Sequence, residues 1–161
     1  TDPARIKEAY EKLLKLIPSV KVFNSDSPKQ PFLNNEVVIG QIWGGEVYQA
    51  NEENPDIKYV YPKEGATFWV DSMVIPASAR NIDYAHAFID FMCRPDIAKI
   101  NCEYVGYATA NAKAQEMLNE WTRNHKAAYP DKADLDRGEF QTDVGDAIMI
   151  YEKYWEMLKT Q

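Results

Sequence analysis

The chain has 161 residues, of which 45% are hydrophobic, 12% aromatic and 27% charged. This composition suffices for one compact domain with a sizeable core and excludes a chain too polar to fold. With 25 acidic against 18 basic residues the formal net charge is −7, which disfavours nucleic acid and anionic membrane surfaces as main partners and mildly favours cationic ligands.

No apolar run reaches 18 residues, so the sequence predicts no membrane-spanning helix. The chain opens at Thr1-Asp2-Pro3, without an initiator Met and at the start of a helix. This opening leads us to expect a mature product or a piece of a longer protein. Cys93 and Cys102 are expected to be free thiols near helix ends. A disulfide across nine positions is the alternative, and no spacing predicts a zinc site.

The first half of the chain predicts an amphipathic helix at its start, three strands and a second helix at 46–53. Asp2 and Pro3 suit the cap and first position of the helix, whose apolar residues recur on one face until Pro18. A long polar loop follows over 19–35. Three β-prone runs come next, with a helix at 46–53 after the first; they are EVVIGQIW at 36–43, IKYVY at 57–61 and TFWVDSMVI at 67–75.

The second half predicts four helices. Asn81, Pro95 and Asn111 each open one, and a polar loop over 129–139 precedes a final helix with apolar residues from Val144 to Leu158. Strands first and then a helical run indicate an α/β fold. Three strands make a thin sheet for so much helix, which suggests that the fold is incomplete.

Catalytic patterns are weak in this sequence. His86 and His125 fall on different helices without a ligand pattern, and we expect both to be surface or cap residues. The pair Gly44-Gly45 lacks the remaining glycines of a dinucleotide fingerprint, and no nucleophile motif is present. We therefore expect a binding protein rather than an enzyme, with no cofactor and no metal.

The most informative residues are Trp69 and Asp71. Side chains alternate along a strand, so these two point the same way, roughly 7 Å apart. An indole face attracts an alkylammonium by roughly 0.5–2 kcal/mol, and a carboxylate adds a charge-assisted hydrogen bond. The alternative is that Trp69 is a core residue and Asp71 caps a loop. However, a buried, unpaired carboxylate is costly, so Asp71 needs a positive partner.

Two more aromatic residues are candidates because of where they fall. Trp43 ends the first predicted strand, and Tyr107 lies in a connector between helices. Open α/β sheets place their ligands at strand ends. Taken singly, an aromatic residue in such a place is more often part of the core.

Several runs, in order and over essentially the whole chain, resemble the periplasmic spermidine/putrescine-binding proteins of ABC transporters. These runs are FNSD at 23–26, EVVIGQIWGG at 36–45, YPKEGATFWVDSMVIPASA at 61–79, RPDIAK at 94–99, VGYATAN at 105–111 and GEFQTDVGDA at 138–147. So many motifs in sequence make the resemblance specific.

The resemblance implies a ligand-binding role for five residues. Trp69 would stack on the methylene chain of a polyamine and Asp71 would bind an amino group. Trp43 would line the same cleft, Tyr107 would contribute to the pocket, and Gln141 would hydrogen-bond a terminal amine. Gln141 rests on the resemblance alone.

The resemblance also implies the architecture. The chain would be the C-terminal half of a two-lobed periplasmic binding protein of type II, with the N-terminal half of the protein absent. Residues 1–68 and 118–161 would belong to the second lobe, and the crossover segment 69–117 would complete the first lobe. This division would explain the thin sheet.

The implied function is polyamine capture for uptake, with ABC transporter permease subunits as partners and no nucleic acid or membrane insertion. The protein would be periplasmic, or lipid-anchored outside the cytoplasm through a missing N-terminus. One alternative is a binding protein of the same fold for another cationic ligand, such as agmatine, an amino acid derivative or an opine. The other is an interaction module without a transport role. The sequence does not choose between polyamines.

Overall fold

The computed structural model describes residues 1–160 and divides into two compact units. The first unit combines the two ends of the chain, Thr1–Ser25 and the segment from Gln141 onward. The second unit is the continuous stretch Asp26–Phe140. Within the described residues, no helix has both the length and the apolar character needed to cross a bilayer.

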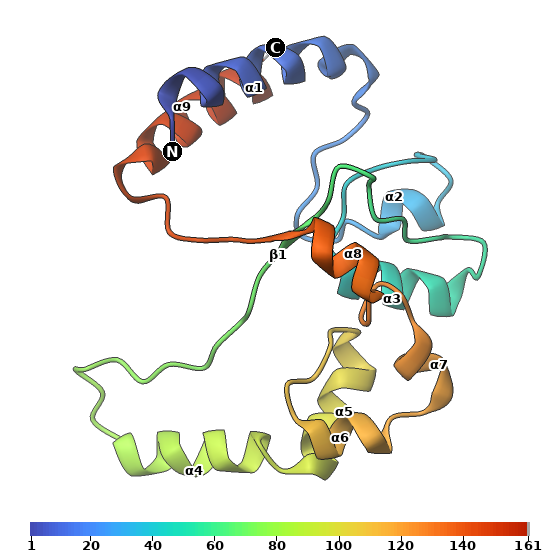
Figure 1. Ribbon diagram of the computed structural model, residues 1–161, viewed down its shortest axis with the longest axis vertical. Coiled ribbons are helices and arrows are strands. Elements are labelled where there is room, and N and C mark those ends of the chain that lie inside the picture. Colours follow the sequence, from blue (N-terminus) through green and yellow to red (C-terminus); the bar gives the residue numbers. More distant parts are fainter. Residues whose placement is uncertain (161) are drawn as a thin grey trace. The chain divides into compact units, whose positions relative to one another are not determined.

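The first unit is a pair of helices, α1 (Pro3–Leu16) and α9 (Ile148–Lys159), which lie side by side (Figure 1). The predicted cap of α1 is confirmed, because the Asp2 carboxylate accepts a hydrogen bond from the Ala4 N–H at 2.9 Å. Tyr10 stacks on Tyr154 with ring centroids 4.8 Å apart. Short 3₁₀ helices adjoin both, η1 at Ile17–Ser19 and η2 at Gly145–Ala147.

The second unit contains seven α-helices among its residues: α2 (Gln30–Leu33), α3 (Gly44–Glu53), α4 (Ile82–Met92), α5 (Pro95–Val105), α6 (Ala112–Met117), α7 (Glu120–Asn124) and α8 (Lys132–Arg137). The predicted single helix after Asn111 is wrong, since Asn119 caps a new one by accepting from the Thr122 N–H at 2.8 Å. Helices α2 and α8 lie in segments that were expected to be loops.

The core of the second unit forms around Tyr48 of α3. Its hydroxyl shares a hydrogen bond of 2.8 Å with the Thr122 Oγ1 of α7, and both side chains are fully buried. Gly106 ends α5 with φ +76°, and a Cβ there would lie 2.5 Å from the Tyr48 ring. Only glycine therefore allows both this backbone conformation and this close packing.

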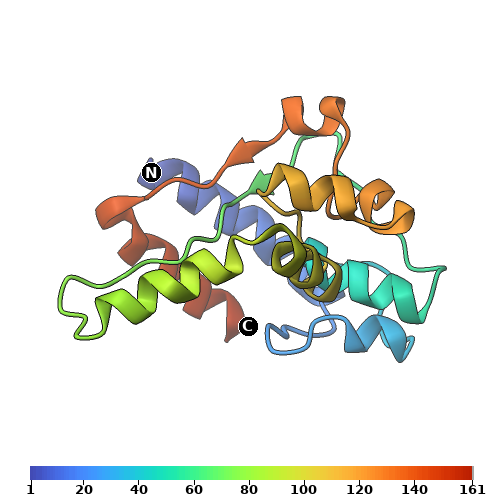
Figure 2. The ribbon, with the colours of Figure 1, turned by 90° about the horizontal axis from the view of Figure 1, so that it is seen from below.

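Of the three predicted strands, the first two are wrong and the third is confirmed only at its first two residues. The described residues contain two strands of two residues each, β1 (Thr67–Phe68) and β2 (Glu139–Phe140), which pair in parallel with Phe68 opposite Phe140 (Figure 2). The segments 36–43, 57–61 and 69–75 have no ladder partner among the described residues. β-propensity alone does not make a strand, because the backbone needs a neighbour to hydrogen-bond.

Helix α4 contributes no buried residue to the second unit. A long irregular segment leads from β1 to α4, which contacts α5 (Figure 1). The α4 side chains of Phe88 and Phe91 are exposed, as are those of Val70 and Val74 in the leading segment. This part of the chain therefore presents apolar side chains that nothing in its own unit covers.

Candidate functional site

Four of the five predicted site residues lie in the unit Asp26–Phe140. Trp43 stands at the N-cap of α3, Trp69 and Asp71 follow β1, and Tyr107 follows the Gly106 cap of α5. Three separate chain segments thus supply these side chains. Gln141 belongs to the other unit, and its ligand-binding role stays a prediction.

Trp69 contacts both Asp71 and Tyr107. Its indole N–H donates a hydrogen bond to the Oδ2 of Asp71 at 3.3 Å. Its ring meets the ring of Tyr107 edge-on, with centroids 6.0 Å apart and planes inclined by 74°. Trp69 remains 39% exposed. The structure therefore brings these three residues together and leaves an indole surface open beside a carboxylate.

Tyr107 is held against the first turn of α3. The backbone of Gly45 acts on the Tyr107 phenol and lowers its pKa, against the larger effect of burial. A Cβ at Gly45 would lie 2.6 Å from the Tyr107 ring and 2.6 Å from the Val105 carbonyl oxygen. Gly45 thus allows the close approach between helix and ring that positions Tyr107.

Electrostatics around Tyr107 identify a carboxylate that the sequence analysis missed. Burial raises the pKa of the Tyr107 phenol, and the nearby charges of Glu46 and Asp71 raise this pKa further. The phenol is therefore neutral near pH 7 and able to donate a hydrogen bond. Glu46 lies in the first turn of α3, three residues after Trp43. This spacing could have indicated Glu46 from the sequence, because residues three apart on a helix are neighbours and Trp43 is already predicted to line the cleft.

Aromatic side chains continue from this cluster toward the small sheet. Tyr59 acts electrostatically on Tyr107 and meets Tyr61 edge-on at 4.9 Å between centroids. Tyr61 lies 6.1 Å from Phe68, and its hydroxyl donates to the Lys126 carbonyl at 3.1 Å. These aromatic residues form a chain of ring contacts that ends at Phe68, the residue before Trp69. Their roles could not be anticipated from spacing, since the contacts join distant segments.

The cluster has the chemistry of a cation-binding site. Aromatic faces attract alkylammonium groups, and two carboxylates, Asp71 and Glu46, act on the same phenol. Within residues 1–160, no three or more His, Cys, Asp or Glu side chains gather in a way that would hold a metal ion. Cys93 and Cys102 are both free thiols, which confirms that prediction.

Comparisons with known proteins find solute-binding proteins, some of them named for binding polyamines. The family model described as bacterial extracellular solute-binding protein matches residues 1–129. The spermidine/putrescine-binding periplasmic proteins of Salmonella typhimurium and Escherichia coli are each 45% identical to the chain over 159 residues. That alignment covers 99% of this chain and 46% of each relative. The chain thus spans about half the length of these curated relatives.

Two solved structures are similar in fold. A protein from Listeria monocytogenes, described as a spermidine/putrescine ABC transporter, superposes with a TM-score of 0.85 at 36% identity, over 98% of this chain and 50% of its own. A spermidine/putrescine ABC transporter substrate-binding protein from Streptococcus pneumoniae superposes with a TM-score of 0.77 at 37% sequence identity. The match covers 99% of this chain and 50% of that protein. The chain has the fold of one half of a two-lobed binding protein, and it belongs to the family of bacterial extracellular solute-binding proteins.

Proposed function

We propose that the protein containing this chain captures a polyamine outside the cytoplasm and delivers it to an ABC transporter. The observation that carries the proposal is the contact of Trp69 with both Asp71 and Tyr107. The names of the relatives from Salmonella and Escherichia coli support the same ligand class. Family membership also makes this chain part of a solute-binding protein and not of an enzyme.

Capture would rest on charge and stacking together. A terminal ammonium of the ligand would bind the Asp71 carboxylate, while the methylene chain would lie against the open Trp69 face. The same carboxylate accepts the Trp69 indole N–H. An ammonium would therefore share or take over this acceptor. Trp43 and Gln141 would complete the contacts, with Gln141 bonding an amine.

The N-terminal half of the protein, which builds most of the first lobe, would supply the opposite wall of the cleft. We propose that residues 1–68 and 118–161 belong to one lobe, and that segment 69–117 crosses to the other and completes its sheet. The uncovered apolar side chains of α4 and of the segment before it support this division, because exposed apolar surface of this kind is usually covered. The N-terminal half of the protein would cover it.

Delivery would follow from closure of the two lobes. Hinge closure around a ligand is a common response of two-lobed binding proteins. The closed form would dock on permease subunits of the transporter, in the periplasm or from a lipid anchor at the membrane surface. We propose no contact with nucleic acid and no insertion into the membrane.

The direct test is to identify the ligand that the full-length protein carries. The protein is purified without added polyamine and denatured, and the released small molecules are identified by mass spectrometry. Spermidine or putrescine in near-stoichiometric amount supports the proposal. A different solute released in that amount, with no polyamine, overturns it.

A second candidate ligand is agmatine. One similar protein, from Pseudomonas aeruginosa, is a putrescine/agmatine-binding protein that is 29% identical over 81% of this chain. Agmatine pairs an ammonium with a guanidinium, which also suits a carboxylate beside an indole. The mass spectrometric experiment separates this candidate from spermidine and putrescine.

A further inference from the structure

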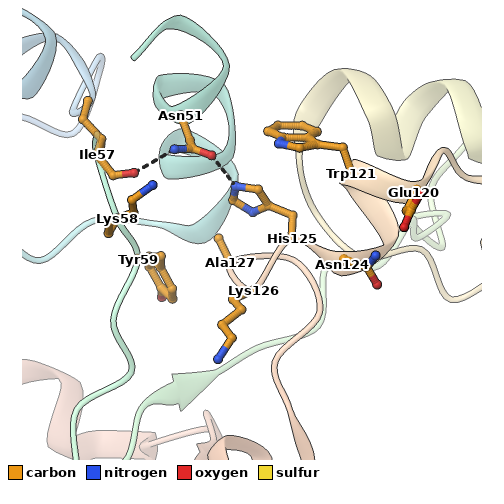
Figure 3. Close-up of a pocket in the computed structure, with 10 residues that line it drawn as sticks. All are labelled: Asn51, Ile57, Lys58, Tyr59, Glu120, Trp121, Asn124, His125, Lys126 and Ala127. Carbon is orange, nitrogen blue, oxygen red and sulfur yellow. Dashed lines mark hydrogen bonds between the residues drawn. The ribbon is translucent and has the colours of Figure 1, made fainter. Parts of the chain in front are cut away.

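The second unit contains a pocket that shares no residue with the group of Trp43, Trp69, Asp71 and Tyr107. It has a volume of about 600 Å³ and lies between the end of α3, the segment 57–59 and α7 with the residues after it (Figure 3). Pockets of this size hold small molecules. All its lining residues come from Asp26–Phe140, so a single compact unit builds it.

A hydrogen-bonded pair, Asn51 and His125, forms one side of the pocket. The Asn51 amide nitrogen donates to the Ile57 carbonyl at 2.8 Å and to the Pro55 carbonyl at 3.2 Å. This fixes the amide so that its Oδ1 faces the His125 Nε2 at 3.2 Å. The Nε2 must therefore carry the proton and donate it to the Asn51 Oδ1. The Asn51 amide is thus hydrogen-bonded through both its nitrogen and its oxygen.

The imidazole of His125 is neutral in this setting. It packs against the rings of Tyr48 and Trp121, at centroid distances of 5.0 and 4.8 Å, and these two rings also contact each other at 4.5 Å. Burial lowers its pKa, and among the described residues no partner meets its buried Nδ1. Any charge that a ligand meets in the pocket thus comes from other side chains.

Those charges favour an anion. Two ammonium groups, on Lys58 and Lys126, line the pocket against one carboxylate, on Glu120. The Lys58 ammonium donates a hydrogen bond to the backbone carbonyl of Pro55, and the Lys126 ammonium lies 4.0 Å from the Asp131 carboxylate. The lining side chains therefore carry a net charge of +1 in a chain whose net charge is −7, whereas two carboxylates act on Tyr107.

The pocket also presents ring surfaces. The Trp121 side chain is 41% exposed beside His125 (Figure 3), and Tyr59 lines the same space. We propose that this pocket binds a small organic anion with a planar ring, whose ring packs on Trp121 and whose anionic group lies between Lys58 and Lys126. This is a second ligand site, chemically distinct from the proposed polyamine site.

The test uses protein labelled with 5-fluorotryptophan and fluorine NMR, with indole-3-acetate as the probe. Trp121→Phe assigns the Trp121 resonance, which we expect to shift saturably with the probe. The uncharged analogue indole-3-acetamide is expected to bind more weakly. Lys58→Gln and Lys126→Gln should each weaken probe binding about two- to fivefold, and Glu120→Gln should strengthen it. The control is Lys113→Gln, which changes a charge of α6 outside the pocket.

The outcomes are distinct. A saturable Trp121 shift that prefers the carboxylate and weakens in both lysine variants, but not in the Lys113 variant, supports the site. Three results overturn it: no saturable shift at Trp121, equal affinity for acid and amide, or a shift confined to the Trp43 and Trp69 resonances.

Discussion

The indole N–H of Trp69 donates to the carboxylate of Asp71, two residues further along the chain, at 3.3 Å. The side chain that would stack on a ligand thus also holds the carboxylate that would bind the ligand's charge. Tyr107, in the segment after α5, contacts the Trp69 ring and also interacts with the first turn of α3. It therefore links the Trp69–Asp71 pair to α3. The site therefore depends on both local spacing and tertiary packing.

Replacing Asp71 by Asn should weaken putrescine binding by the full-length protein. The change removes the charge but keeps the shape and one acceptor, and hydrogen bonds to charged groups contribute roughly 1.5–3 kcal/mol, which corresponds to about a ten- to hundredfold loss of affinity. Isothermal titration calorimetry measures the change. Asp56→Asn, in the turn after α3, is the matched control. Unchanged affinity in the Asp71 variant would remove this residue from the site.

The 161-residue chain alone should bind spermidine far more weakly than the full-length protein does. It carries one wall of the proposed cleft, and lobe closure needs both lobes. Calorimetric titration of both proteins under the same conditions makes the comparison. Micromolar affinity of the isolated chain would refute the expectation, provided that circular dichroism shows that the chain is folded.

The buried hydrogen bond between Tyr48 and Thr122 should be measurable by a double-mutant cycle. Thr122→Val leaves the Tyr48 hydroxyl buried without its 2.8 Å partner, which costs about 1–3 kcal/mol of unfolding free energy. Adding Tyr48→Phe removes the unpaired hydroxyl and should recover part of this loss. Urea denaturation gives the values. Additive effects of the two changes would show that the pair is not coupled.

Stability should fall on mild acidification because of His125. Burial lowers the pKa of this imidazole in the folded protein, so the unfolded chain takes up the proton first as the pH falls. The contribution of neutral His125 is therefore complete above the unfolded pKa of about 6.5 and is lost below it. Urea midpoints between pH 7.5 and 5.5 should decline less steeply in His125→Gln than in wild type. His86→Gln is the control, and a decline that His125→Gln leaves unaltered would contradict the assignment.

Local signals predicted the helices well and the strands badly. Asp2, Pro3 and Gly106 act through their own neighbours in the chain, so the ends of α1 and α5 follow from sequence. A strand such as 57–61 needs a second segment beside it, and propensity does not supply one. The split at Asn119 was missed because a polar cap inside an apolar pattern looks like a surface residue.

The candidate site shows the same division. The alternation of a predicted strand pairs Trp69 with Asp71. The structure does bring them together, by the indole–carboxylate hydrogen bond, but outside the strand, which ends at Phe68. The contact of Tyr107 with Trp69 joins segments far apart in sequence, so spacing could not predict it. The position of Glu46 one helical turn after Trp43 was visible in the sequence, but its effect on Tyr107 was not, because that effect depends on the packing of α5 against α3.

The central claim is that the full-length protein binds a polyamine by recognising its ammonium groups. The most direct measurement is a calorimetric titration of that protein with spermidine, putrescine and butane-1,4-diol, which has the carbon chain of putrescine without its charges. The account predicts saturable binding of at least one polyamine and none of the diol, since carboxylate and aromatic faces select ammonium groups. Binding of the diol as tight as that of putrescine, or no binding of either polyamine, would contradict it.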